Sequence, residues 1–138
     1  MHPVHVQIFH GPPASPGPLA AHLATARLDL AAHHARGFRT AGAADVRIIA
    51  DADERPFGAR LREIAGALPP EDGIVALGSG ALPLADARDR RAFVAAASDP
   101  LGPALANNRY SGDAVAIPDA RRVLALLPDL PGDNALPR

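Results

Sequence analysis

The sequence predicts an α/β fold of three layers, in which helices cover both faces of a mostly parallel β-sheet. Short apolar segments alternate four times with segments of helical periodicity, as expected for parallel strands joined by right-handed crossovers. One apolar segment, Ile74–Leu77, runs without a polar residue into Gly78-Ser79-Gly80, which is typical of a strand buried on both faces. We therefore expect one α/β domain over residues 1–138.

The first half of the chain contains two strand–helix units. The residues of Val4–Phe9 alternate in polarity, which predicts a strand, and Val46–Ala50 is the second strand. The first helix is expected over about Leu19–Phe38, with Gly37 ending its regular part, and the second begins at Pro56. Their apolar stripes consist of Leu19, Leu23, Ala26, Leu30 and Phe38 in the first helix and Phe57, Leu61, Ile64, Ala65 and Leu68 in the second.

The second half continues this alternation after the Ile74–Leu77 strand. A helix over about Ala85–Ala97 stops at Asp99-Pro100, and a helix over about Asp119–Leu127 has one apolar face. Between them, Ala104–Ala106 and Ala114–Ile117 are expected to be short strands. The tail Pro128–Arg138 is rich in Pro and Gly, and its apolar residues suggest that the native domain continues beyond it.

Composition excludes several classes of chemistry. The chain has no Cys, which excludes disulfides and thiolate catalysis, and all 14 basic residues are Arg, which excludes a Schiff-base or phosphate-binding Lys. A net charge of −1 and five aromatic residues give no support for a nucleic-acid surface. No apolar run has the roughly 20 residues of a membrane helix, and the N-terminus lacks the features of a signal peptide, so we expect a cytoplasmic protein.

The residues that follow the third strand mark the expected edge of a ligand site. In open parallel sheets, ligands bind just beyond the carboxyl ends of the strands. The glycines of Gly78–Leu84 allow a sharp turn and leave backbone N–H groups accessible. His10 follows the first strand in the same way, and it could donate to a phosphate or act as a base, although a surface role is the more frequent one.

A second polar tract, Asn107–Asp113, lies between the two short strands. The amides of Asn107 and Asn108 could contact a nucleotide base, Arg109 could hold a phosphate or carboxylate, and Asp113 could be a metal ligand. The tract has equally the composition of a polar hairpin turn. Both interpretations stay open at this stage.

For the other charged groups, structural roles are the simpler expectation. The five remaining His residues are expected at the surface or its boundary, and the carboxylates that follow the second strand are expected to favour the start of the next helix rather than a metal. Arg55 and Arg60 are expected in surface salt bridges. The solvated faces of the later helices should carry Arg88, Arg90, Arg91, Arg121 and Arg122.

Three short motifs resemble the nucleotidyltransferase-like fold of the GT-A type, the fold of nucleotide-diphospho-sugar transferases. They are the Ala41–Ile49 joint between helix and strand, Gly78–Leu84 and Asp133–Leu136, and they are most similar to molybdenum-cofactor and phospholactate guanylyltransferases. The resemblance implies a reversed strand late in the sheet and a nucleotide or nucleotide-sugar as ligand. It also implies transfer of a nucleotidyl or glycosyl group with Mg²⁺ or Mn²⁺ as cofactor.

The resemblance gives the candidate residues specific roles. Gly78, Ser79 and Gly80 would contact the ligand through their backbone, with His10 beside them, while Asn107, Asn108 and Arg109 would bind base, sugar or phosphate. Gly80 stands where the family has its metal-binding Asp, so a metal would have to move to Asp113 or Asp133, with Asp113 as the catalytic carboxylate.

Two departures from the family favour an alternative function. The loop over residues 10–18 is rich in Pro and has no Arg or Lys to bind a triphosphate, and the metal-binding Asp is missing at Gly80. The chain could therefore be a non-catalytic module for binding or assembly, in which an oligomer is one possible state. An unrelated flavodoxin-like fold would instead have an all-parallel sheet of order 2-1-3-4-5.

Overall fold

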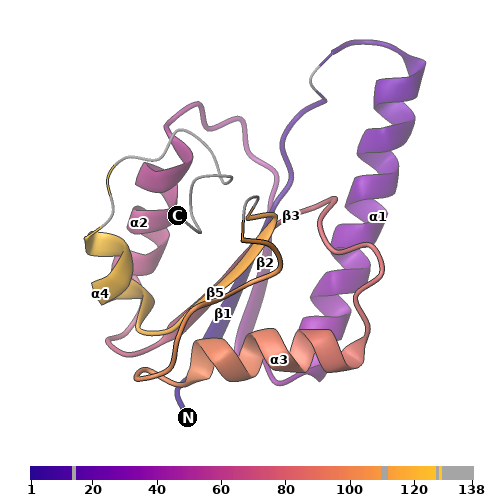
Figure 1. Cartoon of the computed structure of the whole chain (residues 1–138). Helices are drawn as coiled ribbons and strands as arrows, with labels where there is room; N and C mark the ends of the chain where they lie inside the picture. Colours follow the sequence, from indigo (N-terminus) through magenta and orange to yellow (C-terminus); the bar gives the residue numbers. More distant parts are fainter. Residues whose placement is uncertain (14, 110–111, 127, 129–138) are drawn as a thin grey trace.

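The computed structural model describes residues 1–13, 15–109, 112–126 and 128, and these form one open five-stranded sheet with four helices (Figure 1). The elements lie within a residue or two of the predicted positions in most cases. The strands are β1 (Val4–Phe9), β2 (Asp45–Ile49), β3 (Gly73–Gly78), β4 (Leu105–Ala106) and β5 (Ala114–Ile117), and the helices are α1 (Pro18–Thr40), α2 (Phe57–Gly66), α3 (Ala87–Ser98) and α4 (Ala120–Ala125).

The strand order is β2-β1-β3-β5-β4, and the sheet is mixed. Strand β1 pairs in parallel with β2 and β3, whereas β5 runs antiparallel to both of its neighbours, β3 and β4. The expected late reversed strand is therefore confirmed, and it is β5. The flavodoxin-like alternative does not fit, because it requires an all-parallel sheet.

The helices form a layer on each face of the sheet, as predicted. On one face, α1 and α3 contribute Phe38 and Phe93 to a core that includes the apolar side of β1. On the other face, α2 and α4 contribute Leu61 and Leu124 to a smaller core over β3 and β5. Strand β3 is buried between the two layers, which explains its uninterrupted apolar sequence.

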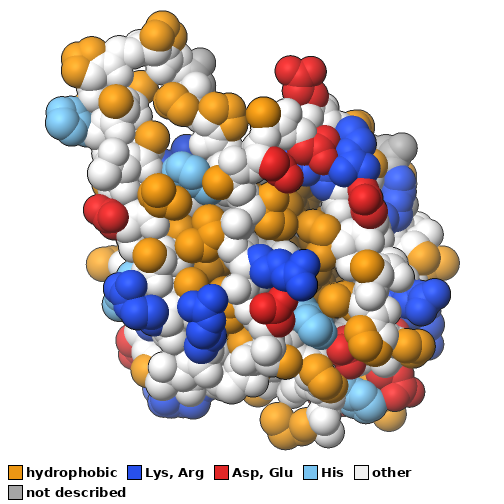
Figure 2. All heavy atoms as spheres, turned by 180° about the vertical axis from the view of Figure 1, so that it is seen from behind, with side chains coloured by type: hydrophobic (Ala, Val, Ile, Leu, Met, Phe, Trp, Pro, Cys, Tyr) orange, Lys and Arg blue, Asp and Glu red, His pale blue; other side chains and the backbone are white. Residues whose placement is uncertain are grey.

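The expected apolar stripe of α1 is wrong for its first half. Leu19 is 71% exposed and Leu23 is 56% exposed, and the N-terminal part of the helix extends beyond the sheet (Figure 1) and carries hydrophobic side chains on the face seen in Figure 2. The 23 residues of α1 give a length of about 35 Å, whereas a six-residue strand spans about 20 Å. The helix is therefore longer than the sheet, and it buries only Ala31, His34, Ala35 and Phe38.

Gly37 does not end α1, which continues to Thr40. The glycine instead leaves room for Arg90 of α3, because a Cβ atom added at Gly37 would lie 2.6 Å from the Cδ atom of Arg90. Arg90 was expected on a solvated helix face, and this is wrong: it is 6% exposed, with its guanidinium 3.4 Å from Nδ1 of His34.

Some of the expectations fall on residues outside the described part of the chain. These include Asp133, and with it the Asp133–Leu136 motif, as well as Tyr110 and Ser111 of the polar tract. Among the described residues, no helix has both the length and the apolar character needed to cross a membrane.

Candidate functional site

The carboxyl ends of β1 and β3 meet at one edge of the sheet, as parallel neighbours must. The chain leaves β1 at His10, whose N–H donates to the carbonyl of Ile49 at the end of β2, at 2.8 Å. It leaves β3 at Ser79, whose N–H donates to the carbonyl of Phe9, also at 2.8 Å. The second of these bonds places Ser79 beside His10, although 69 positions separate the two residues in the sequence.

The Ser79 hydroxyl is the centre of a small polar cluster. Ser79 is fully buried, and its Oγ lies 2.9 Å from Nδ1 of His10. Nε of Arg27, on α1, donates to the same oxygen at 3.2 Å. Three elements therefore meet at one hydroxyl group: the end of β1, the end of β3 and the middle of α1.

A second side chain of α1, His34, fixes the other end of the turn that Ser79 begins. Its Nε2 donates to the carbonyl of Ala81 at 2.9 Å, and its Nδ1 faces the guanidinium of Arg90. Burial lowers the pKa of His34, so the ring is neutral and can accept at Nδ1 while it donates at Nε2. The histidine was expected at the surface, and this is wrong, since it is 0% exposed.

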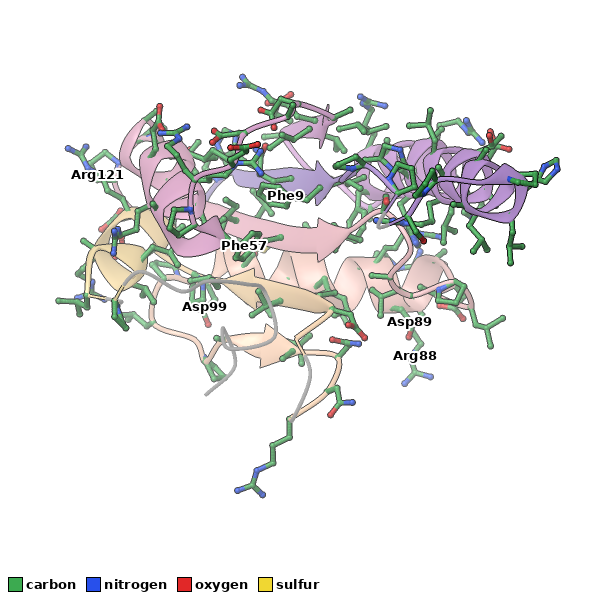
Figure 3. The ribbon with its side chains drawn as sticks, turned by 90° about the horizontal axis from the view of Figure 1, so that it is seen from above. Phe9, Phe57, Arg88, Asp89, Asp99 and Arg121 are labelled. Carbon is green, nitrogen blue, oxygen red and sulfur yellow. The ribbon has the colours of Figure 1, made fainter. Side chains whose placement is uncertain are left out.

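A cavity of about 360 Å³ lies where β1 and β2 end. Its walls include His10 and the partly buried rings of Phe9 and Phe57. Figure 3 labels both rings, which come from β1 and the start of α2 and meet edge to face with centroids 5.0 Å apart. A volume above 300 Å³ with apolar walls and a few polar groups is typical of small-molecule sites.

Arginine side chains pair with two of the three carboxylates that line this cavity, Asp51 and Asp53. Arg60 forms ion pairs with Asp51 and Asp53 and lies over the Phe9 ring, 5.5 Å from its centroid. Arg55 pairs with Asp53 and lowers the pKa of that carboxyl to about 2. Figure 2 shows acidic and arginine side chains next to one another on this face.

The salt bridges expected for Arg55 and Arg60 are thus confirmed. The carboxylates that follow β2 were expected to favour the start of α2. This expectation is not confirmed, because Pro56 is the N-cap of the helix and no side chain caps it.

Asp113 lies on the β3 side of the same edge. Its carbonyl accepts from the N–H of Gly78 at 3.2 Å, and the residue lines a much smaller cavity together with Gly78, Phe9 and Phe57. The structure therefore brings Asp113, Gly78, Ser79 and His10 to one edge. Within the described residues, no group of three or more His, Asp or Glu side chains could hold a metal ion.

The segment Asn107–Arg109 follows directly after β4, which is the strand farthest from β2 in the sheet. Oδ1 of Asn107 accepts from the N–H of Ala114 at 3.0 Å, which closes the connection between β4 and β5 and supports the turn interpretation for this residue. Asn107 also lines a separate apolar hollow with Leu82–Ala85.

Sequence reasoning missed Arg27 and His34 as parts of the site. They lie seven residues apart on α1, two helical turns, and therefore on the same face, so both reach the turn after β3. Two polar residues seven positions apart on a helix lie on one face of it, and this spacing is the signal that could have identified Arg27 and His34.

Comparison with known proteins gives no relative: no family model matches the chain, and neither does any curated protein or solved structure. Any function of this edge must therefore follow from its geometry and chemistry.

Proposed function

We propose that this protein binds a nucleotide, a nucleotide-sugar or a related phosphorylated molecule at the carboxyl edge of β1, β2 and β3. The observation that carries the proposal is the cavity of about 360 Å³ at the end of β1 and β2, next to the Gly78–Gly80 turn. This is where ligands bind in open α/β sheets. The reversed β5 and the three layers agree with the nucleotidyltransferase-like resemblance of the sequence.

The walls of the cavity offer the groups that such a ligand needs. The rings of Phe9 and Phe57 give apolar surface against which a planar base can pack. Asp51 and Glu54 offer carboxylate oxygens to amino or hydroxyl groups of the base and sugar. His10, which lines the cavity and contacts Ser79, is in position to donate to a phosphate.

Binding without transfer is the second candidate function, and one observation favours it. A side chain at position 80 would meet Arg27, since an added Cβ would lie 3.3 Å from Cγ of Arg27. The place of the family's metal-binding Asp is thus next to a guanidinium group. Asp113 lines a different cavity from Asp51, Asp53 and Glu54, and no group of three or more His, Asp or Glu side chains among the described residues could hold a metal ion, so the proposal includes no metal-dependent step.

The proposal is tested by thermal unfolding with nucleoside triphosphates, nucleoside diphosphates and nucleotide-sugars, each with and without Mg²⁺ or Mn²⁺. A ligand at about 100 times its Kd adds about 2.7 kcal/mol to the stability and should raise the Tm clearly. Absence of a shift for every compound at millimolar concentration would overturn the proposal.

A blocking variant locates the site. Ala52 is exposed and lines the cavity, so Ala52→Trp should fill it and abolish the shift. Ala95→Trp, at an exposed position of α3, is the matched control and should leave the shift unchanged. Equal shifts in the two variants would place binding elsewhere. Formation of pyrophosphate or of a free nucleoside diphosphate on incubation with acceptors would distinguish transfer from binding alone.

A further inference from the structure

Arg27 of α1 lies against the turn after β3, close to Gly80. Cγ and Nε of Arg27 lie 3.3 and 3.4 Å from the position of a Cβ at Gly80. The absence of a side chain at Gly80 leaves room for the arginine beside the turn, where its Nε donates to the Ser79 hydroxyl. Gly80 itself is exposed, so this part of the turn is open to a ligand.

The charge of Arg27 has no counter-ion in the described part of the chain. The arginine is half-buried, and among the described residues its one hydrogen bond is to the neutral Ser79 hydroxyl. Arg55 and Arg60, by contrast, each pair with two carboxylates. A partly desolvated guanidinium beside a neutral partner favours an anion, and its planar set of donors suits phosphate oxygens.

Two further donors lie beside this guanidinium. The Ser79 hydroxyl accepts from Arg27 and can donate its hydrogen to Nδ1 of His10, which leaves Nε2 of His10 as the N–H of the ring. The backbone N–H of Gly80 has no acceptor among the described residues, unlike those of Ser79 and Ala81. The cluster thus combines one fixed positive charge with an imidazole and a backbone donor.

We propose that Arg27, His10 and the Gly80 N–H form the subsite for the phosphate group of the ligand. The inference rests on the proposed function and deepens it, because it assigns the group that balances the phosphate charge. That group is a guanidinium from α1, so binding of the phosphorylated ligand does not require a divalent cation. His10 connects the two parts of the site, since it contacts Ser79 and also lines the cavity.

The test is calorimetric titration in EDTA with guanosine, GMP and GDP, and with adenosine, AMP and ADP in parallel. For the wild type, the affinity should rise from nucleoside to nucleotide without added metal. Arg27→Gln, which removes the charge, should weaken nucleotide binding at least tenfold and leave nucleoside binding unchanged. Arg36→Gln is the control, because Arg36 is exposed on the same helix outside the cluster.

A second variant guards against a folding defect in Arg27→Gln. Gly80→Asp places a carboxylate next to the guanidinium and should pair with it, so it should also weaken nucleotide binding in EDTA at least tenfold. Circular dichroism and the Tm show which variants fold.

The possible outcomes separate the two proposals. If no nucleotide binds to the wild type, the proposed function itself fails. If nucleotides bind to the wild type only with Mg²⁺, or bind equally well to the folded variants, the cavity stands as the binding site and the arginine subsite is overturned.

Discussion

The buried His34 should make the free energy of unfolding depend on pH in a defined direction. Burial is the main cause that lowers the pKa of His34 from its ordinary value of 6.5. The positive charges of Arg90 and His33 act in the same direction, while the hydrogen bond to the Ala81 carbonyl opposes them. The unfolded chain therefore binds a proton at this position at a higher pH than the folded protein does.

The sign and the size of the effect follow from this difference in proton binding. Above pH 6.5 the stability contribution is fully present, and it is lost as the pH falls from 6.5 towards the lower pKa of the folded state. One proton gives a slope of at most about 1.4 kcal/mol per pH unit. Between pH 7.5 and pH 5.5, the loss due to His34 is therefore at most about 1.4 kcal/mol.

Urea unfolding at pH 7.5, 6.5 and 5.5 measures this loss in the wild type, His34→Gln and His22→Gln. His34→Gln removes the titrating group, so the free energy of unfolding of this variant should approach that of the wild type as the pH falls. His22 is exposed on the same helix, and its variant should follow the wild-type profile. If the wild type and His34→Gln gave parallel profiles, the explanation from burial would be wrong.

Further predictions concern backbone packing and helix capping. A Cβ at Gly73 would lie 1.9 Å from the carbonyl oxygen of Ala97, so Gly73→Ala should cost about 3 kcal/mol or more in urea unfolding. The matched change Gly66→Ala meets nothing within 4 Å and should be neutral or stabilising by up to about 1 kcal/mol. Asp86 caps α3, and the N–H groups that it binds lower its pKa. Asp86→Ala should therefore lower the Tm at neutral pH. At acid pH the wild-type carboxyl is protonated, so the decrease in Tm should be smaller. An equal decrease in Tm at both pH values would contradict this capping role.

The strands could be predicted from the sequence because their burial is visible locally. Ile74–Leu77 lies between two helical layers, and the absence of polar residues in it requires no knowledge of its partners. The apolar stripe of α1 could not be predicted in the same way. Which part of a long helix is covered depends on the length of the sheet beneath it, and Leu19 and Leu23 lie beyond that sheet.

The polar residues of the site were only partly predictable, for a similar reason. The glycine-rich turn and His10 follow strands directly, so the general rule for α/β sheets indicates them. Arg27 and His34 reach the turn from α1, across 52 and 47 positions of the sequence. Arg90 is buried only because it lies beside His34 and Gly37, a juxtaposition that no local pattern encodes.

The arrangement of the arginines determines where an anion can bind at this edge. On the β2 side, Arg55 and Arg60 are paired with carboxylates, and Glu54 also lines the cavity, so that wall has no net positive charge. On the α1 side, Arg27 lies next to a neutral hydroxyl and an exposed glycine. Under the proposals above, this difference would orient a ligand that has a phosphate and an uncharged polar part, with its phosphate towards Arg27 and its uncharged part against the rings of Phe9 and Phe57.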